Sequence, residues 1–158
     1  MDELGRTLRD KLGRTAVQWS YLYGKLAEHF PEAWVEGFDA IIPSLTNHEK
    51  DRHVLAAAIQ ARAGLIVTYN SKDFRAADLA PWRVAAISPD AFLGDCLDEN
   101  PSLVIAKLDL QAADCGRSTA ELLDRLRLAR VTGFVEKVMA ESGSMHGRSI
   151  GAGQGWAS

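Results

Sequence analysis

The sequence predicts an α/β fold, with a small parallel sheet wrapped by helices and a helical extension behind it. Two adjacent segments carry this prediction. Apolar residues recur at helical spacing between residues 54 and 59, and Gly64 follows them where a helix commonly stops. Residues 65–68, LIVT, then form a short run that ends before the polar pair Asn70-Ser71. Such a run is typical of a strand covered by helices on both faces, as in parallel sheets.

The segments before this unit are predicted to be mainly helical. Leucines at every fourth position predict an amphipathic helix over residues 2–12. Thr15 is a good N-cap for a second helix, and Pro31 closes it. Residues 33–35 are interpreted as a short strand, from which a polar loop leads to Asp51.

The segments after the unit are predicted to be one further strand and then helices. Residues 83–87 are strand-like, and Ser88-Pro89-Asp90 has the order N-cap, first-position proline and first-turn acid. Asp90 is therefore explained by helix initiation and is left out of the site. Three more helices are expected over residues 101–113, 118–130 and 132–140, the second opening with a capping box at Ser118 and Glu121. Residues 141–158 are rich in Gly and Ser and are predicted to be a disordered tail.

Composition excludes several classes of protein. The chain has 158 residues with 47% hydrophobic and 25% charged residues, which is ordinary for one globular domain. Its net charge of −3 gives no general attraction to nucleic acid, so RNA binding would need a local basic patch. Cys96 and Cys115 fit neither a metal spacing nor a disulfide framework, which favours a reduced, cytoplasmic setting. No apolar run is long enough to span a membrane.

Two aspartates are predicted to meet at the carboxyl end of the strand predicted over residues 65–68. Asp73 lies five residues beyond Thr68, and Asp51 begins a helix that enters from the same end. Close carboxylates favour a hard cation, and Mg²⁺ or Mn²⁺ prefers oxygen ligands while keeping several waters. Such an ion can acidify an attacking water. The alternative stays open that Asp51 only complements a helix N-terminus and that Asp73 is a turn or cap residue.

The segments DRHVLAAAI, from Asp51, and IVTYNSKDF, from Ile66, resemble the PIN-domain ribonuclease family, in particular its VapC-type toxin-like subgroup. The resemblance implies a PIN-like small parallel sheet, Mg²⁺ or Mn²⁺ as cofactor, RNA as substrate and a cognate antitoxin as protein partner. Asp51 matches the third acidic position, Asp73 the fourth, slightly displaced, and Glu3 the second.

Further residues of the site follow from the same resemblance or from their neighbourhood. Asn70 stands where many relatives carry an acid, and it is expected to position substrate or water together with Ser71 and Thr68. The basic residues that flank the two aspartates are candidate RNA phosphate contacts, although each is equally explained as an ordinary solvated charge. These are Lys50, Arg52, Lys72 and Arg75.

One part of the family pattern has no counterpart, namely a first hydrophobic strand ending in Asp. The chain is therefore predicted to contain a PIN-like domain lacking its first strand over residues 1–95, a helical extension over 96–140 and the tail over 141–158. A start codon placed too late and a gene that has lost its beginning both explain the missing strand. Weak or no nuclease activity is expected of the chain as given.

Two candidate functions are consistent with the sequence. The first is a metal-dependent endoribonuclease, the toxin of a toxin-antitoxin pair. The second is a catalytically dead PIN remnant that acts as a protein-binding module, pairing with an antitoxin or with itself as a homodimer. A phosphoacceptor receiver-type domain is a weaker third idea, because the acids and lysine that it needs are not clearly present.

Overall fold

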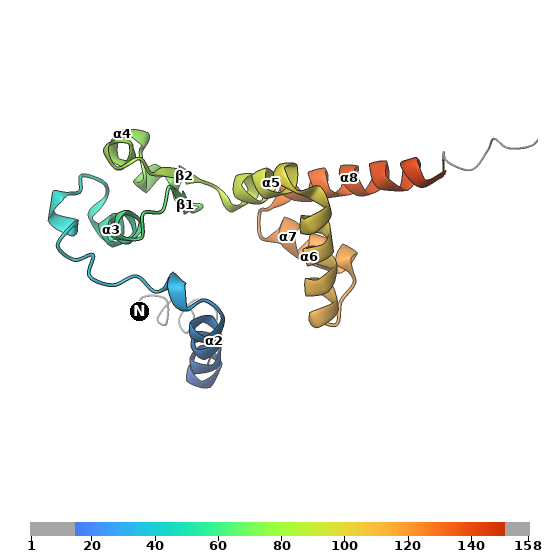
Figure 1. Ribbon diagram of the computed structural model, residues 1–158, viewed down its shortest axis with the longest axis horizontal. Coiled ribbons are helices and arrows are strands. Elements are labelled where there is room, and N and C mark those ends of the chain that lie inside the picture. Colours follow the sequence, from blue (N-terminus) through green and yellow to red (C-terminus); the bar gives the residue numbers. More distant parts are fainter. Residues whose placement is uncertain (1–14, 151–158) are drawn as a thin grey trace, which may run out of the picture.

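The computed structural model describes residues 15–150 of the chain (Figure 1). The helix predicted over residues 2–12, and Glu3 with it, lie outside the described residues, as do residues 151–158. Within the described part, a small α/β unit is followed by a four-helix extension, so the predicted fold class is confirmed.

Helix α2 (Ala16–His29) begins as the sequence predicts. The Thr15 hydroxyl accepts a hydrogen bond from the backbone N–H of Gln18, and the Gln18 side chain accepts one from the N–H of Thr15, which forms a capping box. The helix ends at His29, with Phe30 as its C-cap directly before Pro31. The strand expected at residues 33–35 is wrong, because Pro31–Ala33 forms a 3-10 turn and pairs with no strand in the described part of the chain.

The central unit contains helix α3 (Arg52–Gln60), strand β1 (Leu65–Val67), helix α4 (Ala76–Leu79) and strand β2 (Ala85–Ile87). Between residues 15 and 150 these two strands form the whole sheet. They pair in parallel, with Ile66 opposite Ala86, and α3 contacts β1 while α4 contacts β2. Coverage is incomplete, since Val67 at the end of β1 and Ala85 at the start of β2 are exposed.

Helix α3 ends earlier than Gly64 suggested. The N–H of Ala63 donates to the carbonyl of Ala58, and that of Arg62 to Ile59, which is the Schellman arrangement at a helix C-terminus. Arg62, with φ of +55°, takes the left-handed conformation that glycine usually supplies there. Gly64 therefore lies beyond the helix end.

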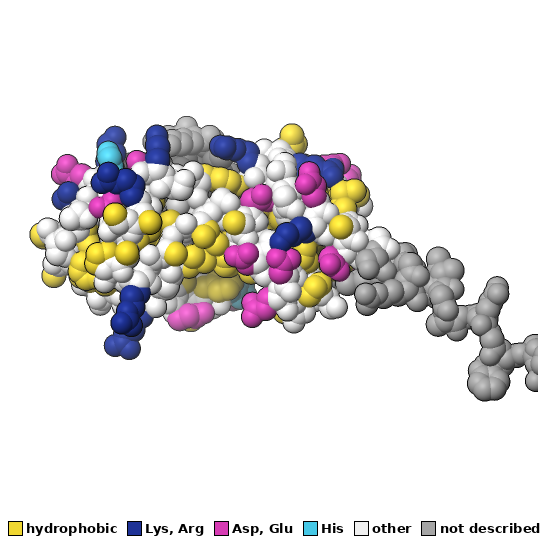
Figure 2. Space-filling model, turned by 90° about the horizontal axis from the view of Figure 1, so that it is seen from above, with side chains coloured by type: hydrophobic (Ala, Val, Ile, Leu, Met, Phe, Trp, Pro, Cys, Tyr) yellow, Lys and Arg dark blue, Asp and Glu magenta, His cyan; other side chains and the backbone are white. Residues whose placement is uncertain are grey.

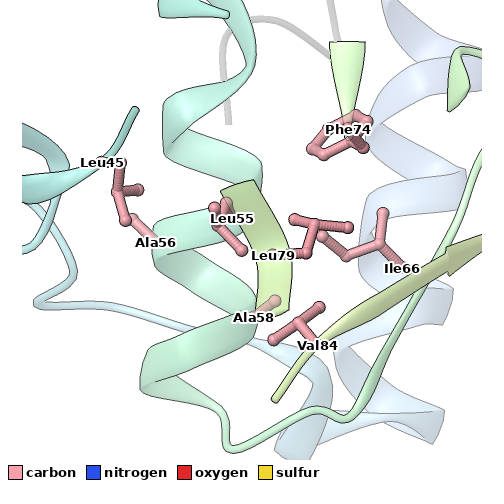
Figure 3. Packing of buried hydrophobic residues seen from close by; sticks show 8 residues of the cluster. All are labelled: Leu45, Leu55, Ala56, Ala58, Ile66, Phe74, Leu79 and Val84. Atoms are coloured by element: carbon pink, nitrogen blue, oxygen red, sulfur yellow. The ribbon is translucent and has the colours of Figure 1, made fainter. Parts of the chain in front are cut away.

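The first core lies between α3 and the strands. Figure 3 shows its eight buried residues, with Leu55 of α3 completely buried. They are Leu45, Leu55, Ala56, Ala58, Ile66, Phe74, Leu79 and Val84. This packing fixes the position of the first turn of α3 relative to the end of β1.

The extension consists of α5 (Pro89–Glu99), α6 (Pro101–Asp114), α7 (Thr119–Leu128) and α8 (Thr132–Ile150). These helices bury a second core of Leu97, Leu108, Val131, Phe134, Val135 and Val138. The predicted caps are confirmed: Ser88 accepts from the N–H of Ala91, and Ser118 and Glu121 form a capping box. Helix α5 packs mainly against α8 and is therefore grouped with the other three helices.

Asp90 initiates α5 as expected, but it also reaches across to α8. Its two carboxylate oxygens accept from the backbone N–H groups of Gly133 (3.2 Å) and Phe134 (2.8 Å). A Cβ atom on Gly133 would lie 2.8 Å from Asp90 Oδ2, so glycine permits this approach. Asp90 thus satisfies free N–H groups in the first turn of a helix more than forty residues away.

Helix α8 continues to Ile150, so the predicted helix end near residue 140 is wrong, and residues 141–150 are helical where a disordered tail was expected. Val135 and Val138 anchor the helix in the second core, and extending an anchored helix costs far less than starting one. No helix among residues 15–150 has the length and apolar character needed to cross a bilayer.

Candidate functional site

Asp51 ends a 3-10 turn, Glu49–Asp51, and stands at the N-cap position of α3. Its side chain makes no capping hydrogen bond. Instead, its Oδ2 atom lies 4.0 Å from Nδ1 of His48, and the side chain is 23% exposed. The carboxylate is therefore not used by the helix end and remains accessible beside His48.

Asp73 closes the loop that follows β1, in the 3-10 turn Ser71–Asp73. Its Oδ2 atom accepts a hydrogen bond of 2.5 Å from the amide nitrogen of Asn70. The Asn70 backbone N–H donates in turn to the Thr68 hydroxyl at 3.0 Å, and the Asp73 N–H donates to the Asn70 carbonyl at 3.2 Å. Asp73 does not cap α4, whose N-cap residue is Arg75. Asn70 therefore orients Asp73 through a hydrogen bond.

A pocket of about 310 Å³ lies beside these groups, lined by Thr46, His48, Lys72, Asp73 and Arg75. His48 lines this pocket together with Asp73, and its Nδ1 atom lies 4.0 Å from the Asp51 carboxylate. The chain segment before α3 and the loop after β1 thus come together on one side of the central unit. The predicted approach of Asp51 to Asp73 stays a prediction, because Asp51 itself does not line this pocket.

The candidate phosphate contacts differ in their surroundings. Lys72 and Arg75 are exposed and line the pocket. Arg75 also donates from Nε to Asp78 at 3.0 Å. Lys50 is exposed, whereas the partly buried Arg52 donates from Nε to the backbone carbonyl of Asn47 at 3.1 Å, so it holds the loop. The hydroxyl of Ser71 is exposed on the same loop as Lys72.

Charge is distributed unevenly along the chain, with a basic balance in the unit that carries the pocket. Residues 45–87 contain six Lys and Arg against four Asp and Glu, whereas residues 89–141 contain six against ten. Figure 2 shows the result on one face: basic side chains and a histidine gather toward the α3–α4 end, and acidic side chains are more frequent over the extension. Of the basic residues in this region, Lys72 and Arg75 line the pocket itself.

Two buried polar residues beside the pocket carried no recognisable sequence signal. Asp78 is buried and accepts from the Thr46 hydroxyl at 2.7 Å and from Arg75. These contacts, the Thr46 hydrogen bond first, hold the pKa of Asp78 below its ordinary value. Asn47 is 1% exposed, and neither polar atom of its amide has a hydrogen-bond partner.

The donor set fits a hard cation in kind but is not complete in the described residues. Between residues 15 and 150 no three His, Cys, Asp or Glu side chains converge closely enough to hold a metal ion. Asp51 and Asp73 supply two carboxylates, and Mg²⁺ commonly takes only one or two from protein and fills its shell with water and substrate oxygens. The third predicted acid, Glu3, lies outside the described residues.

A small parallel sheet with flanking helices defines an α/β protein, consistent with the PIN-like fold class that the sequence predicts. The chain is 41% identical over 85 residues to a curated protein of Mycobacterium tuberculosis named "Putative ribonuclease VapC50". The match covers 54% of this chain and 50% of the relative, so the chain spans about half the length of the protein it matches. It confirms the resemblance to VapC-type PIN-domain proteins. No protein-family model matches the chain, and no solved structure matches it significantly.

Proposed function

We propose that the pocket beside α3 and the loop after β1 form the site of a PIN-like, metal-dependent endoribonuclease, the toxin of a toxin-antitoxin pair. The observation that carries the proposal is that His48 lines a pocket with Asp73 and also lies 4.0 Å from the Asp51 carboxylate, in a chain 41% identical over 85 residues to a ribonuclease-named relative. Asp51, Asp73 and Glu3 are the proposed metal ligands and catalytic residues, for Mg²⁺ or Mn²⁺.

The loop after β1 supports this assignment because it fixes the carboxylate. The Asn70 amide occupies Oδ2 of Asp73, which limits the rotation of the side chain and leaves Oδ1 for a ligand. Thr68 holds the loop through the N–H of Asn70. The exposed Ser71 hydroxyl is placed to contact water or phosphate. A ligand that is fixed beforehand loses less entropy when it binds.

Substrate binding is assigned to the basic side chains around the pocket. Lys72 and Arg75 line it directly, and Lys50 and Arg52 flank Asp51 on the neighbouring turn. Together they neutralise phosphate charge on single-stranded RNA, which an overall acidic chain would otherwise repel. A bound divalent ion would supply an acidified water and charge stabilisation at the phosphodiester. RNA, a cognate antitoxin and a cytoplasmic setting are the corresponding partners and location.

Isothermal titration with Mn²⁺ and cleavage of single-stranded RNA test the proposal. We expect heat of binding from the parent, and at least a tenfold weaker affinity in Asp51→Asn and in Asp73→Asn, since each change removes one charged ligand. Asp95→Asn is the matched control, because Asp95 is an exposed carboxylate on α5, away from the pocket. Cleavage that needs metal and disappears in the Asp51→Asn, Asp73→Asn double variant supports the nuclease. The absence of Mn²⁺ heat from the parent would refute it.

The alternative is a protein-binding module. It is favoured by an apolar groove of about 810 Å³ in the extension and by the incomplete donor set among residues 15–150. The groove is lined by residues of all four extension helices, including Leu93, Leu103, Val104, Leu126 and Phe134. Self-association through this groove would give a dimer in sedimentation equilibrium that Leu103→Glu dissociates. A monomer at high concentration, together with metal-dependent cleavage, leaves the nuclease as the function.

A further inference from the structure

Tyr69 connects the loop of the candidate site to the helical extension. It lies one residue beyond Thr68 and one before Asn70, and its hydroxyl donates to the backbone carbonyl of Ala129 at 2.6 Å. Sixty residues separate donor and acceptor. The central unit and the extension have separate cores, so this hydrogen bond bridges two independently packed parts.

Arg130 reinforces the contact from the extension side. Its guanidinium carbon lies 5.6 Å from the centroid of the Tyr69 ring, within the range of a cation–π interaction. Its backbone φ is +68°, in the left-handed region. Arg130 occupies the position in the Schellman turn after α7 that glycine normally fills: its N–H donates to Arg127 and the next N–H, of Val131, to Leu126. A strained arginine at a glycine position points to a role for its side chain.

The loop that Tyr69 belongs to carries the site residues. The backbone N–H of Asn70 bonds to Thr68 on one side of Tyr69, and the Asn70 side chain bonds to Asp73 on the other. A shift of the tyrosine backbone therefore moves Asn70, and with it the hydrogen bond that orients the Asp73 carboxylate.

We propose that the Tyr69 hydroxyl and the Arg130 guanidinium form a latch by which the helical extension holds the loop of residues 68–73 in place, with Tyr69 as a positioning residue for Asp73. The consequence for metal binding rests on the proposed function. The latch itself does not depend on the proposed function, because it is defined only by contacts between two parts of the chain.

Amide hydrogen exchange on the full chain tests the latch without reference to activity. Tyr69→Phe keeps the ring but removes the hydroxyl, and we expect the amides of Asn70, Asp73 and Phe74 to exchange about fivefold faster, the factor for one net hydrogen bond. Tyr21→Phe is the matched control, since Tyr21 is 69% exposed on α2. Exchange in the cores, at Leu55 for instance, should stay at the parent level.

Arg130→Gly provides a second test, in which loop exchange and global stability are expected to change independently. Glycine relieves the left-handed turn, so global stability should be equal to or greater than that of the parent, while loop exchange rises by a few fold because the cation over Tyr69 is gone. A purely structural role would instead couple loop exchange to global stability. The latch is overturned if loop exchange in Tyr69→Phe equals that in Tyr21→Phe, or if exchange rises equally in loop and cores.

Mn²⁺ titration of the same variants separates the two proposals. If the parent binds Mn²⁺, Tyr69→Phe should bind it several fold more weakly, and unchanged affinity would overturn the positioning role. If the parent binds none, the ribonuclease proposal fails, whereas loop exchange still decides on the latch.

Discussion

The contact between Asp90 and the first turn of α8 offers a direct test of how the extension is stabilised. Asp90→Ala removes two charge-assisted hydrogen bonds, to Gly133 at 3.2 Å and to Phe134 at 2.8 Å, in a partly buried position. Because bonds to a charged group contribute about 1.5–3 kcal/mol and water can replace part of each, we expect a loss of about 2–4 kcal/mol in the free energy of unfolding of the extension.

Thermal denaturation followed by circular dichroism at the helix signal measures the effect. For a cooperative unit of about 60 residues the loss corresponds to a midpoint of the extension lowered by roughly 8–32 °C. Asp90→Asn keeps one acceptor oxygen and should lose about half as much. Asp95→Ala removes an exposed carboxylate from the same helix and should stay within about 0.5 kcal/mol of the parent. Equal losses in Asp90→Ala and Asp95→Ala would show that the cross-helix cap contributes nothing.

The pocket loop allows two further predictions. Asn47→Leu replaces a buried amide without partners by an apolar group of similar size, so urea denaturation should show a gain of about 1–3 kcal/mol, and a loss would mean that the amide is satisfied in solution. Because the pKa of Asp78 is lowered in the folded state, its contribution to stability is present above the unfolded pKa of about 3.9 and is lost as pH falls through the folded value. Thr46→Val removes the largest cause of that shift, so its stability deficit relative to the parent should be constant from pH 5 to 7 and shrink below about pH 4. A deficit that does not change with pH would exclude this linkage.

Local features were predictable because their signals lie within a few residues. The capping box at Ser118 needs only the spacing to Glu121, and the strand β1 needs only its apolar run between Gly64 and Asn70. The same logic predicted that the segment before α3 and the loop after β1 lie close together, and residues of both line one pocket. These are properties of short segments.

Contacts between distant segments were not predictable in this way. No residue near Asp90 indicates that its carboxylate contacts α8. No hydrophobic periodicity in the sequence indicates that Tyr69 contacts Ala129. The left-handed arginines were equally hidden, because glycine is the residue that normally signals such a turn, and Arg62 and Arg130 stand there instead. Such features depend on how packed units meet, which single-segment patterns do not encode.

The two hydrophobic clusters share no residue, and this has a consequence for how the chain denatures. Each cluster buries its own apolar surface. The free energy of unfolding of each unit is therefore set by its own gain from apolar burial and its own loss of chain entropy. Calorimetry should then record a van't Hoff enthalpy smaller than the total heat absorbed, the mark of cooperative units that melt separately. A single melting temperature quoted for this chain would describe neither half.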